Sequence, residues 1–423
     1  MLSYEHAEEK YGIMRILLVP GEFPPHIFGG GGIFMYHLSR GLVKRGHKVY
    51  VVALGFSEEL MDGLCRGVMV ERVNGNLVTI RVFVPKHIYP RHKVFQLCSK
   101  KVIGKLVEKV DIVHLNTGLY HPFIRDVIQR SKKPSVVTIH GDPVIDNKIS
   151  ILLPFISIKD RAYHAVFMLD RMLSLKYEVA ELYPVFVSKQ TVQSISSYIP
   201  MTKYRVIYNG IDFDFIDSSL RRPTSCKPVD FVRKYSEKGY RILVYPARLY
   251  PGKNNVFLLY VNKKLIERDH KVKTIFIGEG PLMTKLKKMS KHLQIEQHII
   301  MTGRLPYEVV LKILSLSHVV PFPSLYESFG LAVIEALYIG KPVVAFNLPY
   351  VRELIDKGVE GIYVAENPLH FVEILDSLLS QVSTINEDSV GTRMREKVME
   401  MFSVELMTDQ YEQLYLDLIK YDT

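Results

Sequence analysis

The stretch Pro323-Ser-Leu-Tyr-Glu327-Ser-Phe-Gly330-Leu-Ala-Val-Ile-Glu335-Ala-Leu337 carries the clearest local pattern in this chain of 423 residues. An apolar run, Val319–Pro321, precedes it and predicts a buried strand, and residues 331–338 predict an amphipathic helix. The start of such a helix presents unpaired backbone N–H groups and the positive end of the helix dipole, which suits a phosphate group. A strand, a loop with a glutamate and a helix, in this order, predict the ligand-binding edge of an α/β sheet.

The same alternation of strand and helix extends through the whole chain. Short apolar runs are separated by longer segments with helical periodicity, such as 254–268 and 281–293. Buried parallel strands have this composition because helices cover both faces of their sheet. The predicted strands are Ile16–Pro20, Lys48–Ala53, Asp111–Leu115, Ser135–His140 and Val185–Ser188 in the first half, and Arg241–Tyr245, Lys273–Gly278, His298–Thr302, Val319–Pro321 and Pro342–Phe346 in the second.

Chain length and element order predict two domains, because 423 residues exceed what one hydrophobic core usually holds. The polar run Ser218–Pro228 predicts a linker close to the boundary. We therefore expect an α/β fold with two Rossmann-like, doubly wound domains, residues 1–205 and 206–400, that face a cleft. An apolar stripe predicts a C-terminal helix within 401–423, which could pack on either half. Residues 1–13 are polar and fit an extension, with Met14 as an alternative start.

Composition restricts the environment in which the protein works. The wide spacing of Cys65, Cys98 and Cys226 fits neither a disulfide framework nor a zinc site, which favours a reducing compartment. No apolar run reaches the ~20 residues that a membrane span needs, and the N-terminus lacks the apolar core of a signal peptide. We expect a cytoplasmic protein, with peripheral contact to the inner face of the membrane as an option.

Positive charge is concentrated in the N-terminal half. Residues 1–200 hold 26 Lys and Arg against 17 Asp and Glu, which leaves +9 of the total of +11. In residues 85–109, Glu108 is the single acidic residue among seven basic ones: Lys86, Arg91, Lys93, Lys100, Lys101, Lys105 and Lys109. A solvated helix face is the simpler interpretation, and contact with anionic lipid is the alternative. Nucleic acid is not an expected partner, because no recognition motif accompanies the charge.

Four charged residues, two within 323–337 and two after the predicted strand Arg241–Tyr245, have two interpretations each. Glu327 could cap the helix, and Glu335 could lie on an exposed polar face. Arg248 and Lys253, which follow the predicted strand Arg241–Tyr245, could be ordinary surface charges. Two cations at this spacing could instead neutralise a pyrophosphate, which arginine binds bidentately, while the carboxylates accept hydrogen bonds from sugar hydroxyls. The whole arrangement favours the second interpretation.

This arrangement resembles a known family. Glu327 and Glu335, separated by seven residues, resemble the paired-glutamate signature of retaining glycosyltransferases with the GT-B fold, in particular family four, the glycosyl transferases group 1. Further matches run from about 205 to 365 at family-like separations. They are Tyr208-Asn209-Gly210-Ile-Asp212, Tyr245-Pro-Ala-Arg248-Leu-Tyr-Pro-Gly-Lys253, Ile277-Gly278-Glu-Gly280-Pro281 and Thr302-Gly303-Arg304.

The N-terminal half resembles the family in fewer places. The run Gly29-Gly30-Gly31-Gly32, before a predicted helix, resembles the family's first glycine loop, in which glycines let the backbone approach a phosphate or sugar. A flexible turn is the simpler explanation of these glycines. The segments Asp111-Ile-Val-His114 and Val137-Thr-Ile-His140-Gly141 resemble two strand ends of the family. The resemblance makes His140 the histidine that contacts the sugar, whereas His114 fits a structural role.

The resemblance implies transfer of a hexose from a UDP- or GDP-linked sugar to a glycan, lipid or small-molecule acceptor, with retention and by front-face attack. It implies no metal and no obligatory cofactor, since the nucleotide sugar is the substrate. The acceptor, the sugar and the base stay unassigned. The implied catalytic residues are Glu327, His140, Arg248 and Lys253. The implied donor-binding residues are Gly29, Gly30, Arg248, Lys253, Gly278, Arg304, Glu327, Ser328, Phe329, Gly330, Leu331 and Glu335, with Glu335 on the ribose.

Three alternatives remain for function. A nucleotide-sugar epimerase shares this fold, although the paired glutamates favour transfer. A non-catalytic nucleotide-sugar-binding subunit is disfavoured because Glu327, Arg248 and Lys253 are intact. A glycogen- or starch-synthase-like glucosyltransferase is disfavoured because Phe28-Gly29-Gly30-Gly31 replaces the expected Lys-Thr-Gly-Gly-Leu loop. The pair Asp212-Phe-Asp214 fits an Asp-x-Asp metal motif, but that motif belongs to a different glycosyltransferase fold.

Overall fold

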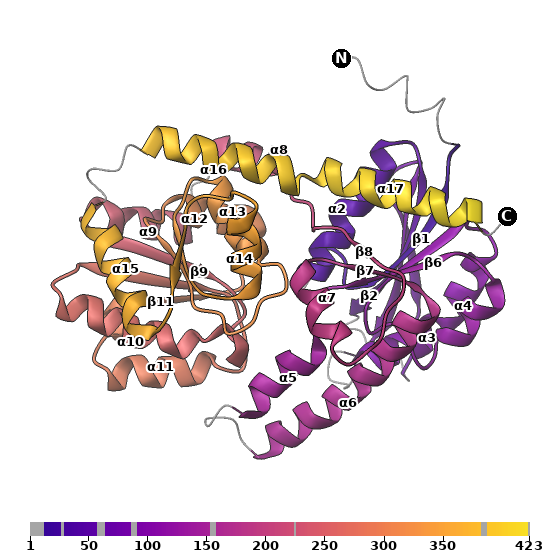
Figure 1. Cartoon of the computed structure of the whole chain (residues 1–423), viewed down its shortest axis with the longest axis horizontal. Helices are drawn as coiled ribbons and strands as arrows, with labels where there is room; N and C mark the ends of the chain where they lie inside the picture. The colour runs from indigo at the N-terminus through magenta and orange to yellow at the C-terminus, as the bar shows by residue number, and fades with distance from the viewer. Residues whose placement is uncertain are drawn as a thin grey trace. The chain divides into compact units, whose positions relative to one another are not determined.

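The computed structural model describes residues 12–26, 29–56, 64–85, 91–152, 158–223, 226–381 and 387–421. Within them the chain forms two compact units, each with its own parallel sheet and helices (Figure 1). Unit 1 comprises the described residues of Met1–Val144, Ala165–Gly210 and Val404–Thr423, and unit 2 those of Ile145–His164 and Ile211–Ser403.

Unit 1 is built on an eight-stranded sheet with the order β3-β4-β2-β1-β5-β6-β7-β8. All neighbouring strands are parallel except β3 and β4, which form an antiparallel hairpin. The strand order reverses between β1 and β5, so the carboxyl ends of these two strands form the switch point of the sheet. The strands are β1 (Arg15–Gly21), β2 (Lys48–Phe56), β3 (Val68–Arg72), β4 (Leu77–Val84), β5 (Ile112–Asn116), β6 (Ser135–Ile139), β7 (Tyr183–Phe186) and β8 (Arg205–Val206).

Helices cover both faces of this sheet. The helices of unit 1 are α2 (Gly30–Lys44), α3 (Arg91–Val107), α4 (Arg125–Ser131), α7 (Lys189–Ser196), α17 (Val404–Tyr421) and the larger part of α6 (Ile158–Glu181). Most of α5 (Pro143–Leu152) and the start of α6 belong to unit 2. Side chains of α3, α4, α6 and α7 contribute to one apolar core, and those of α2 and α17 contribute to the other. The C-terminal helix α17 therefore lies along α2 in unit 1 (Figure 1), because its stripe of Tyr411, Leu414 and Tyr415 is buried there.

Unit 2 has two three-stranded parallel sheets, β11-β10-β9 and β12-β13-β14. A parallel bridge between Leu243 and Val319 joins β9 to β12, so the strands follow the order 3-2-1-4-5-6 of a dinucleotide-binding fold. The switch point lies between β9 and β12. The strands are β9 (Arg241–Pro246), β10 (Val272–Ile277), β11 (Ile299–Gly303), β12 (Val320–Phe322), β13 (Val343–Phe346) and β14 (Ile362–Ala365). The predicted α/β class with doubly wound parallel sheets is confirmed.

The helices of unit 2 alternate with these strands. They are α8 (Phe213–Arg221), α9 (Lys227–Glu237), α10 (Asn255–Glu267), α11 (Met283–His292), α12 (Tyr307–Ser315), α13 (Leu331–Tyr338), α14 (Pro349–Asp356), α15 (Pro368–Gln381) and α16 (Glu387–Phe402), with short 3-10 turns η1 (Pro251–Lys253) and η2 (Glu296–His298). The expected linker Ser218–Pro228 contains the end of α8 and the start of α9 instead. Helix forms there because Ile216 and Val229 bury apolar faces, and proline is well tolerated in the first turn of a helix.

The cysteine prediction is wrong. Cys65 and Cys98 form a disulfide, with their Cα atoms 5.3 Å apart. The predicted strands omitted the β3–β4 hairpin, whose chain begins beside Cys65 and which packs close to α3, the helix that carries Cys98. This hairpin brings together two cysteines that are 33 residues apart. The disulfide removes the cysteine argument for a reducing compartment. No helix among the described residues is long and apolar enough to cross a bilayer.

Candidate active site

In unit 2, the loops that follow β9 and β12 meet at the switch point of the sheet. The backbone N–H of Leu325 donates a hydrogen bond to the carbonyl oxygen of Gly252 at 2.9 Å, which ties the two loops together. Beside this bond, the Lys253 Nζ donates to the Glu327 Oε2 in an ion pair. Their side chains are only 20% and 15% exposed, so this pair is partly withdrawn from solvent and is stronger than a surface pair.

The ion pair rests on a buried support. The hydroxyl of Tyr245, at the end of β9, donates to the backbone carbonyl of Lys253 at 2.7 Å. Tyr245 is fully buried, and burial raises the pKa of its hydroxyl, so it stays a donor at any physiological pH. The backbone that carries Lys253 is therefore held independently of its charged side chain.

Arg248 belongs to the same loop but differs from Lys253 in its surroundings. Its side chain is exposed, and its guanidinium carbon lies 5.9 Å from the centre of the Tyr250 ring. It makes no ion pair with any residue that the structure describes. A cation of this kind is available to bind an anionic ligand without first breaking a salt bridge.

The glycine turn after β10 packs directly against the Arg248 loop. Gly278 has a φ of +145°, and a Cβ atom there would lie 2.3 Å from the carbonyl oxygen of Ala247. Only glycine fits this position, because both the conformation and the close contact exclude a side chain. Arg304 follows β11 and pairs with Glu279 of this turn at 3.7 Å, with both side chains more than half exposed. The turn that carries Gly278 therefore adjoins the Arg248 loop, and Arg304 contacts this turn through Glu279.

The helix α13 begins beside Glu327, as the opening stretch predicts. Its N-terminal residue is preceded by Gly330, which has a φ of +66° and makes no side-chain cap. A Cβ atom on Gly330 would approach the Tyr350 ring to 2.9 Å, so glycine is required here too. Phe329 is buried against Tyr350 and Phe402. The alternative that Glu327 caps this helix is wrong, because its carboxylate pairs with Lys253 instead.

Ser328 and Leu331 stand on either side of this turn. Ser328 is buried and donates to the hydroxyl oxygen of Tyr326 at 3.3 Å, while Leu331 opens the helix. The first amide groups of a helix have no partner within the helix. The residues 328–331 therefore combine a rigid turn with the positive end of a helix dipole, next to a carboxylate and a lysine.

Glu335 is buried rather than on an exposed polar face. Its side chain is 6% exposed, and its Oε1 accepts a hydrogen bond from the Tyr307 hydroxyl at 2.8 Å. Burial raises the pKa of this carboxyl to about 7. Tyr307 begins α12 and stacks on Phe215 of α8, with ring centres 5.7 Å apart. Tyr307 thus fixes the direction of the carboxyl group that the resemblance assigns to the ribose.

In unit 1, three chain segments meet at the switch point between β1 and β5. Gly29 and Gly30 begin α2, directly after β1 and its loop. Asn116 ends β5, and His140 directly follows β6. The Nε2 of His140 lies 3.0 Å from the Oδ1 of Asn116, and the Asn116 Nδ2 donates to the carbonyl oxygen of Gly31 at 3.1 Å. Burial lowers the pKa of His140 to about 3, so the imidazole is neutral.

His114 has a structural environment. It is fully buried, with Nδ1 2.5 Å from the Tyr415 hydroxyl and Nε2 2.7 Å from the Thr138 hydroxyl oxygen. The Tyr411 ring stacks on it with centres 5.1 Å apart. These contacts fasten α17 to β5 and β6, which accounts for the histidine without any ligand. Asp212 likewise caps α8 by accepting from the Phe215 N–H at 2.9 Å, so its place in an Asp-x-Asp pattern has a local explanation.

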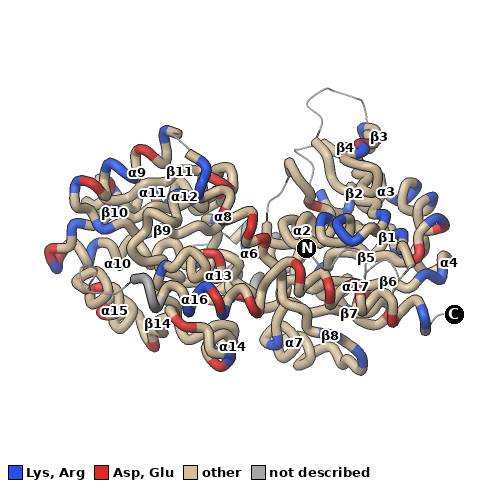
Figure 2. Tube along the Cα trace, turned by 90° about the horizontal axis from the view of Figure 1, so that it is seen from above, with Lys and Arg blue, Asp and Glu red and all other residues tan. Residues whose placement is uncertain are grey.

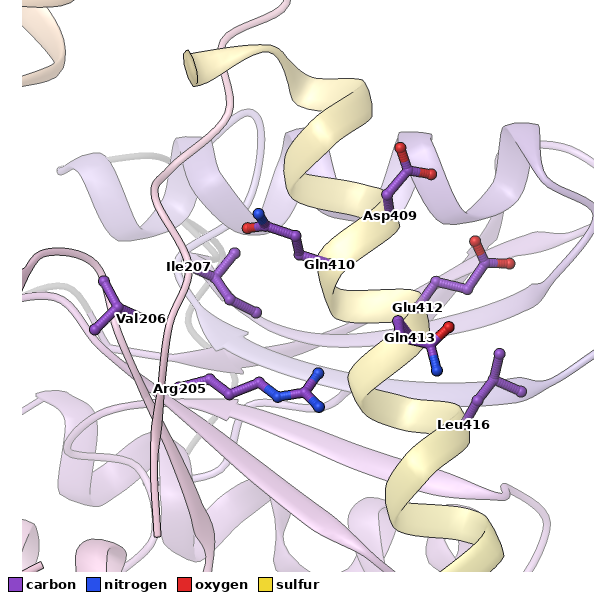
Figure 3. A pocket seen from close by; sticks show the side chains of 8 residues that line it. All are labelled: Arg205, Val206, Ile207, Asp409, Gln410, Glu412, Gln413 and Leu416. Atoms are coloured by element: carbon purple, nitrogen blue, oxygen red, sulfur yellow. The ribbon is translucent and has the colours of Figure 1, made fainter. Parts of the chain in front are cut away.

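A cavity of about 500 Å³ in unit 1 lies away from these residues, between β8 and α17 (Figure 3). Arg205 and Leu416 lie on opposite sides of it, and none of the predicted site residues lines it. Its charged side chains are already paired, since Arg205 contacts Asp417 at 2.7 Å and Glu412 contacts Arg45 at 2.6 Å. This cavity lies where α17 packs against the edge of the sheet, and its paired charges do not indicate a binding site.

Sequence reasoning missed three residues that hold the site. In the sequence, Tyr245 has the pattern of an ordinary aromatic residue at a strand end, and Tyr307 that of one at a helix start. Asn116 has the pattern of a polar residue at the end of an apolar strand. A weak signal was available for Asn116, because polar side chains at the carboxyl ends of strands that flank a switch point tend to face the ligand. Nothing in the sequence signals the partners of the two tyrosines.

Two doubly wound units, one of which carries a lysine–glutamate pair beside a helix N-terminus at its switch point, have the architecture of the GT-B fold. The model of the glycosyl transferases group 1 matches residues 228–393, and that of glycosyltransferase family 4 matches residues 28–215. The chain belongs to this family, group 1 and family 4, as the sequence resemblance indicates, and it is a glycosyltransferase enzyme.

Relatives and solved structures agree over nearly the whole chain. An uncharacterized glycosyltransferase of Methanocaldococcus jannaschii is 27% identical over 87% of this chain and 89% of its own length. The N-acetyl-alpha-D-glucosaminyl L-malate synthase of Bacillus anthracis is 21% identical over 93% of this chain and 95% of its own length. The structure of Anabaena HepE in complex with UDP and glucose has a TM-score of 0.66 at 15% identity, and covers 96% of this chain and 100% of its own.

Proposed function

We propose that this glycosyltransferase moves a hexose, with retention, from a UDP- or GDP-linked sugar to a glycan, lipid or small-molecule acceptor. The observation that carries the proposal is the Lys253–Glu327 pair beside the N-terminus of α13. A cation and a helix N-terminus suit the diphosphate, and a carboxylate suits the sugar that the diphosphate releases. The bound UDP and glucose of the similar Anabaena protein support a nucleotide-sugar donor.

The ion pair itself suggests how the site changes when the donor binds. Without a ligand, Lys253 and Glu327 neutralise each other in a partly buried position. A diphosphate brings two further negative charges and competes for the Lys253 ammonium group, because opposite charges at short range dominate such a site. Lys253 then turns to the phosphate, with Arg248 and the amides of 328–331 as further donors. The Glu327 carboxylate is freed for the hexose.

The released carboxylate has a defined task in a retaining transfer. Negative charge develops on the leaving diphosphate, and positive charge develops at the anomeric carbon. Fixed cations and amide dipoles stabilise the negative charge on the diphosphate, and the Glu327 carboxylate stabilises the positive charge at the anomeric carbon. The acceptor hydroxyl attacks from the face that the diphosphate leaves, and its proton passes to the leaving phosphate. We assign His140 to a hexose hydroxyl and Glu335, held by Tyr307, to the ribose.

A lipid surface is the second partner that we propose, through helix α3. Lys and Arg recur along α3 (Figure 2), but Lys93 and Lys100 pair with Asp170 and Asp126 at 2.9 and 2.8 Å. Lys101 and Lys105 remain on the exposed side of the helix. Lys86 lies outside the described residues.

The neighbouring helix α6 favours lipid over a merely solvated basic face. It carries Val166, Leu169 and Leu173 on one side, with 69%, 63% and 46% of their surfaces exposed. Exposed apolar residues at helical spacing mark an interaction surface, and cations on a neighbouring helix are complementary to anionic headgroups. Both helices cover the same face of the unit 1 sheet.

Thermal shift against a panel of nucleotides and nucleotide sugars tests the donor assignment. A ligand that binds only the folded state at one hundred times its Kd stabilises the protein by about 2.7 kcal/mol. We expect stabilisation by one nucleoside diphosphate and its sugar, and loss of that stabilisation in Arg248→Ala, whose exposed side chain leaves the unliganded protein unchanged. Arg233→Ala, an exposed arginine on α9, is the matched control. A response to no nucleotide would refute the proposal.

Two alternatives give different results. A nucleotide-sugar epimerase consumes the donor without an acceptor and releases a free epimer. A non-catalytic subunit gives the same thermal shift but no product with any acceptor. Product analysis on the donor that the panel identifies therefore separates transfer from both.

A further inference from the structure

Asn116 occupies the centre of the unit 1 switch point and touches all three segments that meet there. Its side-chain nitrogen donates to the carbonyl oxygens of Pro20 and Gly31, at 3.1 Å each. Its side-chain oxygen lies 3.0 Å from the Nε2 of His140. The residue is only 7% exposed, so these three contacts account for its polar atoms without solvent.

These contacts determine which way the amide group faces. The two backbone carbonyls can only accept hydrogen bonds, so the NH₂ group of Asn116 must point towards Pro20 and Gly31. The Oδ1 then faces His140 and can only accept. Hence the proton of the imidazole lies on Nε2, and the other ring nitrogen, Nδ1, carries a lone pair. This Nδ1 has no hydrogen-bond partner in the part of the chain that the structure describes.

The surroundings keep this arrangement rigid. Phe34 lies against the imidazole edge to face, with ring centres 4.9 Å apart. A Cβ atom on Gly31 would come within 3.3 Å of both the Asn116 amide nitrogen and the imidazole, so the helix start is fitted closely around the pair. The turn after Asn116 is anchored by the buried Glu178, which accepts from the Gly118 N–H at 2.5 Å.

We infer that Asn116 is a positioning residue that holds His140 in its neutral Nε2–H form and so presents Nδ1 as a hydrogen-bond acceptor for a hexose hydroxyl. This inference rests on the proposed function, which assigns the hexose to His140. A neutral acceptor suits that role, because the hexose ring becomes positively charged in the transition state and an imidazolium nearby would oppose it. A hydroxyl can donate its proton to Nδ1, whereas an Nδ1–H form would turn that contact into a donor.

Nuclear magnetic resonance of ¹⁵N-histidine-labelled protein tests the tautomer without any ligand. Two-bond ¹H–¹⁵N correlations distinguish the Nε2–H form from the Nδ1–H form, and His140→Gln identifies the signal. We expect the Nε2–H form across pH 5.5–8 in the wild type and a mixture of both forms in Asn116→Ala. A wild-type His140 with its proton on Nδ1, or an unchanged tautomer in Asn116→Ala, would overturn the inference.

Binding of UDP-glucose compared with UDP tests the consequence for the sugar. We expect Asn116→Ala to lose about three- to tenfold of the UDP-glucose affinity while its UDP affinity holds, since one hydrogen bond is worth about that much. In Asn116→Asp the carboxylate raises the pKa of His140. At pH 6 the ring is then an imidazolium, whose Nδ1 carries a proton and cannot accept a hydrogen bond. At pH 8.5 the ring is neutral again, and Nδ1 is once more an acceptor. A merely structural role for Asn116 would weaken both ligands alike and at both pH values.

Asn262→Asp is the matched control. Asn262 is a fully buried asparagine of unit 2 that donates to the Leu258 carbonyl oxygen at 2.8 Å and accepts from Thr274 at 2.9 Å. The Asn262→Asp variant introduces a buried carboxyl group as Asn116→Asp does, but in a different unit from His140, and we expect the His140 tautomer to stay unchanged. If the wild type binds neither UDP nor UDP-glucose, this donor assignment fails, and the tautomer measurement alone decides the role of Asn116.

Discussion

At the switch point of unit 2 a lysine faces a glutamate, whereas the switch point of unit 1 joins a histidine and an asparagine that carry no charge. In unit 2 the pair stands on the loops that follow β9 and β12, the two strands where the sheet order reverses. In unit 1 Asn116 ends β5, one of the two strands at the reversal, and His140 follows the next strand, β6. The same topology thus presents two kinds of chemistry. The proposed function assigns the charged cluster to the diphosphate and the neutral cluster to the hydroxyls of the sugar.

The difference also concerns how each cluster is held. In unit 2 the backbone that carries Lys253 is fixed by the Tyr245 hydroxyl, while the charged side chains of Lys253 and Glu327 pair with each other. In unit 1 the Asn116 side chain makes the three hydrogen bonds that join the cluster. A ligand can therefore exchange partners in unit 2, but it meets a preformed hydrogen-bond surface in unit 1. The following variants test this contrast, beginning with the largest effect.

Glu327→Gln should lower turnover by about 10²–10³-fold, the usual cost of losing one electrostatic contact to a transition state. Nucleotide affinity should hold or rise, because Lys253 loses its competing partner. Steady-state rates with the identified donor and calorimetry with UDP measure the two effects. Glu279→Gln, an exposed glutamate on the neighbouring glycine turn, is the control. Near-normal turnover in Glu327→Gln would remove this carboxylate from the mechanism.

Glu335→Gln should stabilise the unliganded protein at alkaline pH. The pKa of this carboxyl is about 7 in the folded protein and 4.5 as the ordinary value, so its stabilising effect is complete below pH 4.5 and is lost as the pH rises through 7. The loss amounts to about 3 kcal/mol above that range. Glutamine avoids it and can still accept from Tyr307.

The measurement is the difference in melting temperature between Glu335→Gln and the wild type at pH 5 and pH 8. It should grow with pH, and exposed Glu237→Gln should show no such trend. An equal difference at both pH values would mean that Glu335 is already ionised in the folded protein.

Lys253→Met should weaken UDP binding by about 10–150-fold, because a hydrogen bond to a charged group contributes roughly 1.5–3 kcal/mol. It also leaves the Glu327 carboxylate unpaired next to the diphosphate. The double variant Lys253→Met with Glu327→Gln should recover part of the affinity, which calorimetry can measure as a double-mutant cycle. Additive losses would show that the two side chains do not compete for the same site.

Lys101→Gln should reduce binding to vesicles with anionic lipid by about fivefold, since each cation near such a surface contributes about 1 kcal/mol. Cosedimentation with phosphatidylserine vesicles, compared with phosphatidylcholine vesicles, measures this effect. Lys288→Gln, an exposed lysine of unit 2, is the control. Equal binding of Lys101→Gln and the wild type would return α3 to the simpler interpretation of a solvated face.

The sequence was most informative where the site is local. Arg248 and Lys253 follow one strand, and Glu327 and Glu335 lie within one strand–loop–helix unit, so two short segments carry the residues that we propose for the donor. The alternation of apolar strands and amphipathic helices likewise predicted both doubly wound sheets, because each strand and helix expresses its own periodicity. The predicted helix 331–338 coincides with α13.

The sequence was least informative where distant segments meet. The β3–β4 hairpin and the Cys65–Cys98 disulfide were missed, although β4 is a buried strand with an apolar pattern that the sequence analysis left unassigned. An exposed polar face was the alternative interpretation of Glu335, but its side chain is buried and accepts a hydrogen bond from Tyr307 of another helix. The pattern of neighbouring residues cannot predict such contacts, because they join segments that are distant in the sequence.

By itself, the sequence determined the α/β class, the two-part layout and the motifs that place this chain among the group 1, family 4 glycosyltransferases. Only the tertiary structure decided that Lys253 holds Glu327, that Tyr415 holds His114 across 301 residues of chain, and that Asn116 orients His140. The physical reason is that strand periodicity is a property of neighbouring residues. The direction of a hydrogen bond depends on which loops the finished sheet brings to the same edge.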